Sequence, residues 1–435
     1  MDRMAYLDQS LTKHVAIIGG GYAGMAAAVT LAQNGIKTTV FEAGKTLGGR
    51  ARQVMLNGIC LDNGQHLLLG AYSETLRLVK LVAPAQAAWL RRPMELHTLN
   101  GLRLSAPYLP APLNTLLALL TARGLSASER FAAIRFMLSQ RLKHFKLKRD
   151  MPVAQLLKLH AQPLALVDKL WAPLCIAALN TPVSIASAQI FLNVLRDSLT
   201  RRRSDSDLVF PARDLTALFP QPAADFVRAH GGNVMTGKTV DVIEKTADGF
   251  AVHGDHFSHV ICAVAPHQAL RLLAGLEGLS GARTLIEAFH YQPITTVYLQ
   301  YSVGINLAKP MLGLTSGLSQ WVFDRGMTHG QHGLLAVVIS AEGHHRELDA
   351  VALAQQIDKE LRDALGNLPT PHWHKVIVEK RATYSCDAGI KRPTQITALK
   401  NFYLAGDYTA SEYPATLEAA IRSGVKCAQL ILDPA

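Results

Sequence analysis

The sequence has few cysteines, and none of them lies near another in the chain. Five are present among 435 residues, and no two have the CxxC spacing. They are Cys60, Cys175, Cys262, Cys386 and Cys427. An odd number of scattered thiols argues against a disulfide framework and against a zinc cage. Unpaired cysteines are typical of reducing compartments, so we expect a cytoplasmic protein.

Long apolar runs are missing as well. Residues 104–122 come nearest to one. Their first half is broken by Pro107, Pro110 and Pro112, so we expect no transmembrane helix. Residues 1–13 are polar and lack the apolar core of a signal peptide.

Charged residues are scarce at 18%, whereas hydrophobic residues reach 49%. A chain of 435 residues is too long for one compact core, so two domains are expected. The apolar excess indicates an apolar pocket or an apolar surface. Lys and Arg exceed Asp and Glu by 44 to 33, which gives a formal charge of +11. A basic surface favours nucleic acid, anionic lipid or an anionic cofactor, and the charge alone does not choose among them.

The sequence contains no pattern that is typical of a metal site or of a nucleic-acid site. The later histidines do not have the spacing of metal ligands, and no basic–aromatic module for nucleic acid is evident. These histidines are His329, His332, His344, His345, His372 and His374. We therefore expect no metal and no nucleic-acid partner.

The first fifty residues contain a strand–turn–helix–strand pattern. Residues 14–18 (HVAII) form a short apolar run that ends in three glycines. An alanine-rich stretch over 23–33 follows, and Asn34-Gly35 would end it as a helix C-cap. Residues 37–41 (KTTVF) are rich in β-branched side chains and lead to Glu42. The pattern predicts one βαβ unit.

The turn of this unit has the spacing of a dinucleotide site. Gly19 permits the turn, Gly21 lets a pyrophosphate approach the backbone, and Gly24 lets helix and strand pack closely. The helix N-terminus then presents free N–H groups to the phosphates. Glu42 ends the second strand, where its carboxylate would accept both ribose hydroxyls. The alternative is a glycine turn in an ordinary α/β domain.

A second glycine pair distinguishes FAD from NAD as the cofactor. Gly48, Gly49, Arg50 and Ala51 follow Glu42 closely. The two glycines give close access to the backbone, and an arginine fork suits a diphosphate. The alternative is a surface turn with a solvated arginine.

The remaining pattern predicts an α/β protein in which a Rossmann-type FAD-binding domain is interleaved with a substrate domain of helices and an antiparallel sheet. Strand character occurs at 232–245, 250–265, 295–301, 334–339, 375–379 and 401–407, and helical spacing at 416–432. The predicted FAD-binding pieces are 1–104, 201–266 and 386–435. The predicted substrate pieces are a mainly helical or lid part, 105–200, and a part with a mixed sheet, 267–385.

Two separated blocks resemble one superfamily. IIGGGYAGMAAA with VFEAGKTLGGRA, and LAGDYTASEYPATLEAAIRSG at 404–424, are similar to the FAD-binding motifs of the amine oxidase and phytoene desaturase flavoproteins. The resemblance implies bound FAD, with Tyr22 and Ala23 beside the glycines. It places Gly406 and Asp407 at the pyrophosphate or ribitol and the Val240 backbone at the adenine. It also places the backbone of three further residues at the flavin N1–O2 edge. These are Thr416, Leu417 and Glu418.

A third block narrows the resemblance. LDNGQHLLLGAY, residues 61–72, is similar to the signature of the squalene-associated FAD-dependent desaturases, which are hydroxysqualene dehydroxylases. The resemblance implies that reduced flavin N5 delivers hydride to an allylic carbon of a C30 polyprenoid after water is lost. An electron donor must then reduce FAD again. His66 and Asp62 are the candidate proton donors, and a structural role is the alternative for each. Other readings are a carotenoid-type desaturase, an amine oxidase relative, and an FAD-binding membrane partner without chemistry.

Residues 108–149 combine apolar and basic side chains. YLPAPLNTLLALL is apolar but broken by prolines, and a helix with apolar residues at three- and four-residue intervals follows. Its apolar residues are Phe131, Ile134, Leu138, Leu142 and Phe145; its basic residues are Arg130, Arg135, Arg141, Lys143, Lys146, Lys148 and Arg149. We expect a lid that touches anionic lipid peripherally on the cytoplasmic face. The alternative is a core-facing helix with a solvated outer face.

Overall fold

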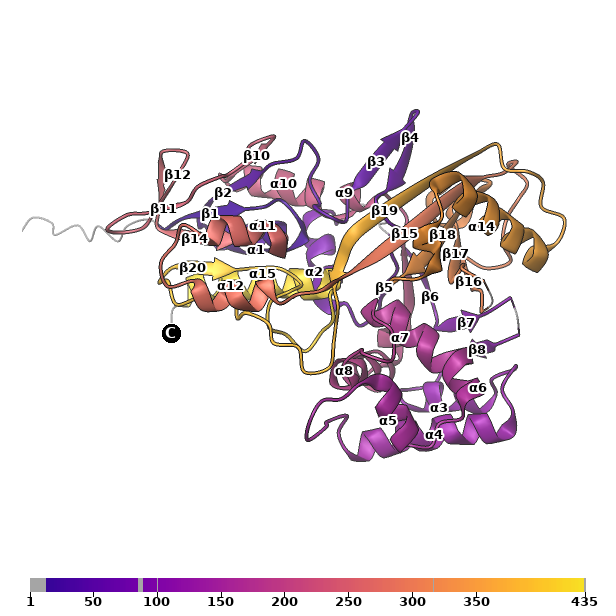
Figure 1. Ribbon diagram of the computed structural model, residues 1–435. Coiled ribbons are helices and arrows are strands. Elements are labelled where there is room, and N and C mark those ends of the chain that lie inside the picture. The colour runs from indigo at the N-terminus through magenta and orange to yellow at the C-terminus, as the bar shows by residue number, and fades with distance from the viewer. Residues whose placement is uncertain (1–12, 85–88, 100, 316, 434–435) are drawn as a thin grey trace, which may run out of the picture.

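The computed structural model describes residues 13–84, 89–99, 101–315 and 317–433. The first twelve residues, in which we expected no signal peptide, lie outside the described residues. Figure 1 shows a parallel sheet with its helices at one end of the molecule. An antiparallel sheet and a group of helices lie at the other end (Figure 1).

The parallel sheet brings together strands from the beginning, middle and end of the chain. Its order is β10-β2-β1-β14-β20, and neighbouring strands are parallel. The strands are β1 (His14–Ile18), β2 (Lys37–Glu42), β10 (Asn233–Thr236), β14 (His259–Cys262) and β20 (Phe402–Leu404). The central strand β1 is apolar and buried over its last four residues, as expected for a strand covered on both faces.

Helices cover this sheet, and two of them approach each other closely. α1 (Tyr22–Gln33) is almost wholly buried and rich in alanine. α15 (Leu417–Leu432) packs against it: a Cβ on Gly424 would lie 2.0 Å from the Ala23 carbonyl oxygen. Small residues are therefore required where these two helices cross. The other helices of this end are α2 (Ser73–Val82), α9 (Leu215–Leu218), α10 (Pro220–Ala229), α11 (Pro266–Leu273) and α12 (Ser280–Glu287).

The antiparallel sheet has the order β16-β17-β18-β15-β19. Its strands are β15 (Tyr291–Gln300), β16 (Met311–Gly313), β17 (Trp321–Asp324), β18 (Leu334–Ser340) and β19 (Trp373–Tyr384). The register of β15 and β19 shifts between Gln292 and Ile294, on either side of Pro293, which has no N–H to donate. Every residue of β18 is buried, and α14 (Ala350–Leu365) packs beside the sheet (Figure 1). The short helices α13 (Arg325–His329) and η3 (His344–Glu347) flank β18.

The remaining strands form small sheets. β3 (Gln53–Leu56) and β4 (Ile59–Asp62) form a hairpin, as do β12 (Phe250–Val252) and β13 (Asp255–Phe257), with β11 (Glu244–Lys245) at their edge. β9 (Leu208–Pro211) pairs with β5 (Leu68–Leu69) and β6 (Trp89–Arg92), and β7 (Glu95–His97) pairs with β8 (Arg103–Ser105). β7 also contacts β16, so the β7–β8 hairpin lies with the substrate end. We therefore propose that the first FAD-binding piece ends before β7 rather than at residue 104.

Residues 113–199 are mostly helical, as their spacing predicted. The helices are α3 (Leu113–Leu120), α4 (Ala127–Leu142), α5 (Val153–Leu159), α6 (Leu164–Leu166), a π-helical turn (Val167–Trp171), α7 (Ala172–Leu179) and α8 (Ala188–Leu199); a 3₁₀ turn (Arg203–Ser206) follows. Together with the two sheets they confirm the predicted α/β class. None of the helices in the described residues is long and apolar enough to cross a bilayer.

The predicted basic helix is shorter than its spacing suggested. α4 starts with a capping box between Ser126 and Glu129 and ends at Leu142. His144 and Phe145 then take left-handed backbone angles, and the Phe145 ring is 3% exposed. The chain turns there because Phe145 enters the core, so the helix cannot run on to residue 149. The expectation of one helix over 130–149 was wrong.

Candidate cofactor and substrate site

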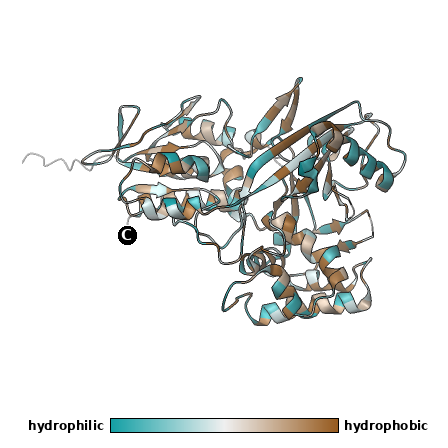
Figure 2. Ribbon diagram, in the orientation of Figure 1, coloured by the Kyte–Doolittle hydropathy of each residue, from teal (hydrophilic) through white to brown (hydrophobic). Residues whose placement is uncertain are grey.

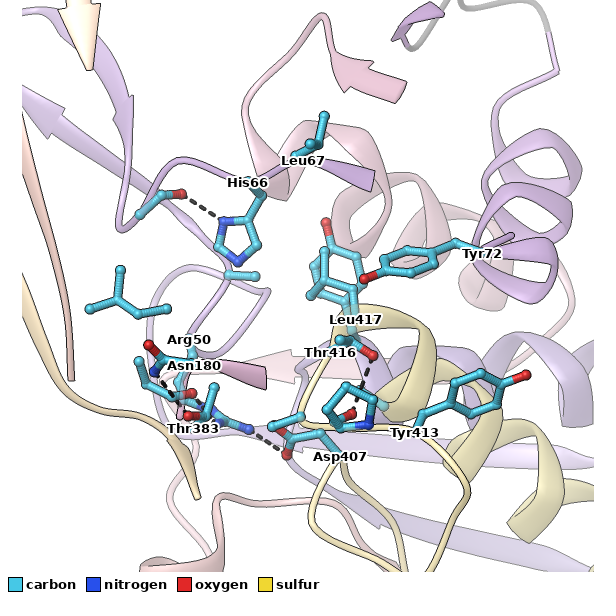
Figure 3. Close-up of a pocket in the computed structure, with 18 of the residues that line it drawn as sticks. Arg50, His66, Leu67, Tyr72, Asn180, Thr383, Asp407, Tyr413, Thr416 and Leu417 are labelled. Atoms are coloured by element: carbon cyan, nitrogen blue, oxygen red, sulfur yellow. Dashed lines mark hydrogen bonds and ion pairs between the residues drawn. The ribbon is translucent and has the colours of Figure 1, made fainter. Parts of the chain in front are cut away.

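A cavity of about 910 Å³ lies between the parallel sheet and the substrate end. Segments from all parts of the chain line it, and Figure 3 shows Arg50, His66, Asp407 and Thr416 around one part of it. Of the residues predicted to bind FAD, the lining includes Gly19, Gly21, Tyr22, Ala23, Glu42, Gly48, Gly49, Arg50, Ala51, Val240, Gly406, Asp407, Thr416 and Leu417. Gly24, Glu418 and Asp62 lie outside the lining.

The glycines between β1 and α1 have distinct surroundings. A Cβ on Gly24 would lie 2.0 Å from the Gly19 carbonyl oxygen, so this position permits only close packing of turn and helix. A Cβ on Gly21 would meet nothing nearer than 3.9 Å, because this residue faces the open cavity. Gly21 also begins α1 without any side-chain cap, and the first turn of α1 has no acidic residue. The free N–H groups of that turn therefore suit an anion.

Glu42 lies at the end of β2 beside this turn. Its carboxylate accepts hydrogen bonds from the backbone N–H groups of Gly20 and Gly44, both at 2.7 Å. The side chain is thereby fixed at the cavity wall. Each carboxylate oxygen keeps acceptor capacity for a hydroxyl group of a ligand.

Arg50 joins the two distant FAD-binding blocks. Its guanidinium donates to Asp407 Oδ1 at 2.6 Å and to the Ala382 carbonyl at 2.6 Å (Figure 3). Burial opposes the charge, but Asp407 raises the pKa of Arg50. Arg50 is thus engaged with protein groups and does not present its whole fork to a diphosphate. Because Asp407 accepts but cannot donate, a ribitol hydroxyl suits it better than a pyrophosphate oxygen.

The C-terminal block turns two of its predicted residues into the cavity and one away. Thr416 caps α15 by accepting from the Ala419 N–H, and Thr416 and Leu417 line the cavity. The Glu418 carboxylate is 1% exposed and caps α2 instead, with bonds from Thr75 N at 2.9 Å and Thr75 Oγ1 at 2.7 Å. The side chain of Glu418 therefore supports the fold.

The residues present fit a flavin dinucleotide. The glycine turn leaves space above Gly21 and Gly49, and the first turns of α1 and α15 both border the cavity. The Tyr408 hydroxyl is buried in the same wall and has no hydrogen-bond partner within the described part of the chain. That hydroxyl is not accessible from the cavity, so the fit depends on the open glycine turn and on the two helix N-termini.

Asp62 belongs to a buried polar network. Its carboxylate accepts from Arg325 at 3.0 Å and from the Leu215 N–H at 2.8 Å. Arg325 is 1% exposed and also donates to Gln65 Oε1 at 2.8 Å. Burial raises the pKa of Asp62, although Arg325 opposes this shift. The network holds residues 62–65 in place, and Asp62 itself does not reach the cavity.

His66 does reach the cavity. Its Nδ1 lies 2.7 Å from the Gly64 carbonyl oxygen, which can only accept, so Nδ1 carries the proton and Nε2 has the lone pair in the neutral ring (Figure 3). Burial lowers the pKa of His66, while the bond to Gly64 raises it. A buried imidazole of lowered pKa becomes a strong acid once Nε2 is protonated.

The far part of the cavity is apolar. Its walls come from the antiparallel sheet, from the β7–β8 hairpin and from the helices between residues 113 and 199. These side chains are Leu96, Leu104, Leu119, Met137, Leu170, Trp171, Leu174, Phe191, Val194, Leu195, Met311, Trp321, Phe323 and Val338. Such a lining suits a hydrocarbon and offers few groups that bind a charged molecule.

Sequence reasoning missed several residues of this site. Tyr72 lines the cavity and ends the block 61–72, so its position in that block was a usable signal. Burial raises the pKa of Tyr72, so its hydroxyl stays protonated and remains a donor. Tyr408 lies in the block 404–424 but was not singled out there. Arg325 lies in no motif and supports the site only through its bonds to Asp62 and Gln65.

A Rossmann sheet with this cradle and these two helix N-termini defines an FAD-dependent oxidoreductase. The model of the flavin containing amine oxidoreductase family matches residues 22–432, and the chain belongs to that family. The resemblance stated from the sequence is thereby confirmed, and FAD is the cofactor.

Relatives and solved structures agree with this assignment. The chain is 28% identical to the hydroxysqualene dehydroxylase of Sinorhizobium fredii, over 97% of this chain and 99% of the relative. It is 25% identical to a 15-cis-phytoene desaturase of an Oncidium hybrid cultivar, over 96% of this chain and 78% of the relative. The crystal structure of an oxidoreductase from Methanosarcina mazei shares the fold at a TM-score of 0.74 and 14% identity, covering 97% of this chain and 100% of that one.

Proposed function

We propose that this enzyme removes the hydroxyl group of hydroxysqualene and yields squalene. The observation that carries the proposal is one continuous cavity that runs from the FAD cradle, past His66, into a deep apolar chamber. A C30 polyprenoid with one hydroxyl group matches a chamber whose lining away from the cofactor is mostly apolar. The hydroxysqualene dehydroxylases among the relatives support the same substrate.

The reaction needs one proton and one hydride. Protonation of the hydroxyl lets it leave as water, and the allylic carbon then accepts the hydride, so that R–OH, H⁺ and H⁻ give R–H and water. Reduced FAD, when bound, supplies the hydride from N5. An external electron donor must then reduce FAD before the next turnover.

His66 is the proposed proton donor. Its Nδ1 is held by Gly64, so a proton available for transfer sits on Nε2, at the opposite edge of the ring. Apolar walls around it keep bulk water from the allylic cation, which would otherwise re-form the alcohol. Tyr72 lines the same cavity, and we propose that its neutral hydroxyl donates to the substrate oxygen.

One experiment decides the reaction and its direction. FAD-loaded enzyme is reduced anaerobically with dithionite, freed of excess reductant and mixed with hydroxysqualene. We expect the oxidised flavin spectrum to return as one equivalent of squalene forms. Phytoene and a simple amine should leave the reduced spectrum unchanged.

The second candidate is a carotenoid-type desaturation, which the phytoene desaturase among the relatives favours. It runs in the opposite sense, because the oxidised flavin takes hydride from the substrate. The discriminating measurement starts from oxidised enzyme and phytoene. Bleaching of the flavin there, with no reoxidation by hydroxysqualene, would replace the first proposal by the second.

We also propose that the helical end rests on an anionic bilayer, which would hold the substrate. Several apolar side chains of residues 108–142 are exposed, and hydrophobic segments reach the lower edge of the helices in Figure 2. They are Tyr108 (85%), Leu113 (57%), Phe131 (64%), Leu138 (43%) and Leu142 (84%). Arg141, Lys143, Lys146 and Lys148 are exposed beside them. Apolar and basic groups on one surface match the acyl and headgroup layers of such a bilayer.

Replacement of these four basic residues by Gln tests the membrane contact. Each charge contributes about 1 kcal/mol near an anionic surface, so sedimentation with anionic vesicles should be lost. FAD content and activity in detergent should stay near the parent values. The control replaces Lys37, Lys375, Lys391 and Lys400, which are exposed elsewhere. If both variants sediment like the parent, the contact lies on another surface.

A further inference from the structure

Two hollows of the helical end share part of one wall. The apolar chamber reaches Thr115 on α3, Met137 on α4 and Leu199 at the end of α8. The same three residues line a small groove on the outer side. The rest of this groove consists of Pro112, Leu116, Leu138, Arg141 and Thr200. A single layer of side chains therefore separates the chamber from the outer groove, and we call Thr115, Met137 and Leu199 the portal.

Two of the three portal residues are buried, and Leu199 is half-buried. Thr115 is 3% exposed and Met137 is 5% exposed. Thr115 Oγ1 donates to the Leu199 carbonyl oxygen at 3.1 Å and so ties α3 to the end of α8. Met137 is unbranched and can change rotamer with little cost, unlike a β-branched side chain. Because the three residues come from three helices, a small shift of α3 against α4 separates them.

The outer groove faces the surface proposed to touch lipid. Leu138 and Arg141 belong both to the groove and to that surface. Leu113 and Leu142, at 57% and 84% exposure, lie on the same two helices. A hydrocarbon that leaves the acyl layer at this point would meet apolar side chains first and the portal next.

The opposite end of the cavity is unsuited to a hydrocarbon. Glu42, Arg50 and Asp407 line it together with backbone N–H groups of the glycine turn. An apolar chain passing there would strip water from charged groups without replacing their hydrogen bonds, which is unfavourable.

We propose that an isoprenoid hydrocarbon enters the chamber from the bilayer through the portal of Thr115, Met137 and Leu199. The inference rests on the proposed polyprenoid substrate. In this proposal a rotamer change of Met137 opens the portal, and the Thr115–Leu199 hydrogen bond keeps it closed. The chain would enter end first, and the polar carbon of the substrate would stop near His66.

The test measures entry apart from chemistry. FAD-loaded protein is mixed rapidly with phosphatidylglycerol vesicles that contain squalene, and the change in flavin fluorescence reports arrival of the hydrocarbon. Met137→Trp should slow this arrival by roughly tenfold, because an indole must displace packed neighbours before the wall opens. Thr115→Val keeps the shape of the side chain but removes its hydrogen bond to Leu199, so arrival should accelerate by about two- to tenfold. Met327→Trp is the matched control, since Met327 is 42% exposed and outside the cavity lining, and its rate should equal that of the parent.

The outcomes separate this inference from the proposed function. Equal arrival rates in Met137→Trp, Thr115→Val and the parent would overturn the portal, whatever the enzyme does with hydroxysqualene. If Met137→Trp does not fold, an unchanged rate in Thr115→Val has the same consequence. Portal-dependent arrival of squalene in a protein that does not convert hydroxysqualene would retain the portal and reject the reaction.

Discussion

The cofactor end and the apolar chamber of one cavity are built in different ways. At the cofactor end, glycines and helix N-termini expose backbone groups, and single missing side chains such as that of Gly21 create the space. In the chamber, large side chains such as Trp171 and Phe191 define the shape by their volume. Backbone recognition depends on a few fixed positions, whereas recognition by volume tolerates exchange among apolar residues. The two ends should therefore respond to mutation in different ways.

The largest effect is expected at Gly21. A Cβ there meets no atom nearer than 3.9 Å, so Gly21→Val should fold but fill the space above the α1 N-terminus. We expect loss of FAD binding and hence of all activity. Isothermal titration with FAD measures the loss of binding, and the circular dichroism spectrum checks that the variant folds. The control is Gly281→Val, because a Cβ there meets nothing within 4 Å. FAD binding by Gly21→Val at the parent affinity would show that the glycine turn does not hold the cofactor.

His66 tests the region where the cofactor end of the cavity meets the apolar chamber. His66→Gln removes the proposed general acid, and the single-turnover rate should fall by about 10²- to 10⁴-fold. In the parent, burial lowers the pKa of His66, so the protonated fraction falls as pH rises through that value. The rate should therefore decrease with rising pH in the parent and become flat in the variant. A parent-like slope in His66→Gln would assign the proton to another group.

Arg325 tests the buried polar network that holds residues 62–65, next to His66 in the chain. Arg325→Met leaves the buried Asp62 carboxylate without the positive charge of Arg325, which costs about 3–5 kcal/mol of unfolding free energy. Burial already raises the pKa of Asp62, and loss of Arg325 should raise it further. The carboxyl group becomes neutral at low pH, so the deficit should be large at neutral pH and shrink as pH falls. Urea unfolding at both pH values measures it, and adding Asp62→Asn should recover most of the loss; equal deficits at both pH values would contradict the explanation.

Glu42 gives the smallest expected change. Glu42→Ala removes a charged acceptor, so FAD affinity should fall by about one to two orders of magnitude, or roughly 1.5–3 kcal/mol. Glu42→Gln keeps one oxygen for the Gly20 or Gly44 N–H and should lose less. Titration of the three proteins with FAD checks this order. Equal affinities would mean that Glu42 only shapes the turn.

The same contrast explains how much of the protein could be predicted. The turn from Gly19 to Gly24 and the end of β2 at Glu42 were predictable, because a phosphate-binding backbone allows few residue types at fixed spacings. The helices between 113 and 199 were predictable as helices, but not as the walls of a chamber. Any apolar residue of suitable size fills such a wall, so no pattern in the sequence identifies Met137 or Trp171 as lining.

Long-range polar contacts escaped prediction for another reason. Asp62 carried the same motif evidence as His66, yet Arg325, 263 residues away, draws its carboxylate out of the cavity. Glu418 likewise turns to the N-terminus of α2, far from its own block. Partners at such distances in the chain are set by the tertiary fold and leave no local signal.

The ion pair between Arg50 and Asp407 has a consequence for how the chain folds during its synthesis. A ribosome that makes about 5–20 residues each second releases Arg50 tens of seconds before it reaches Asp407. During that interval the glycine turn exists without α15, and neither β20 nor the first turn of α15 is available. The nascent chain must therefore keep the apolar faces of β1 and α1 from aggregating until β20 and α15 have been synthesised. Flavin supply would then act only after α15 has been synthesised, and flavin starvation should reduce the yield of folded enzyme more than the rate of its synthesis.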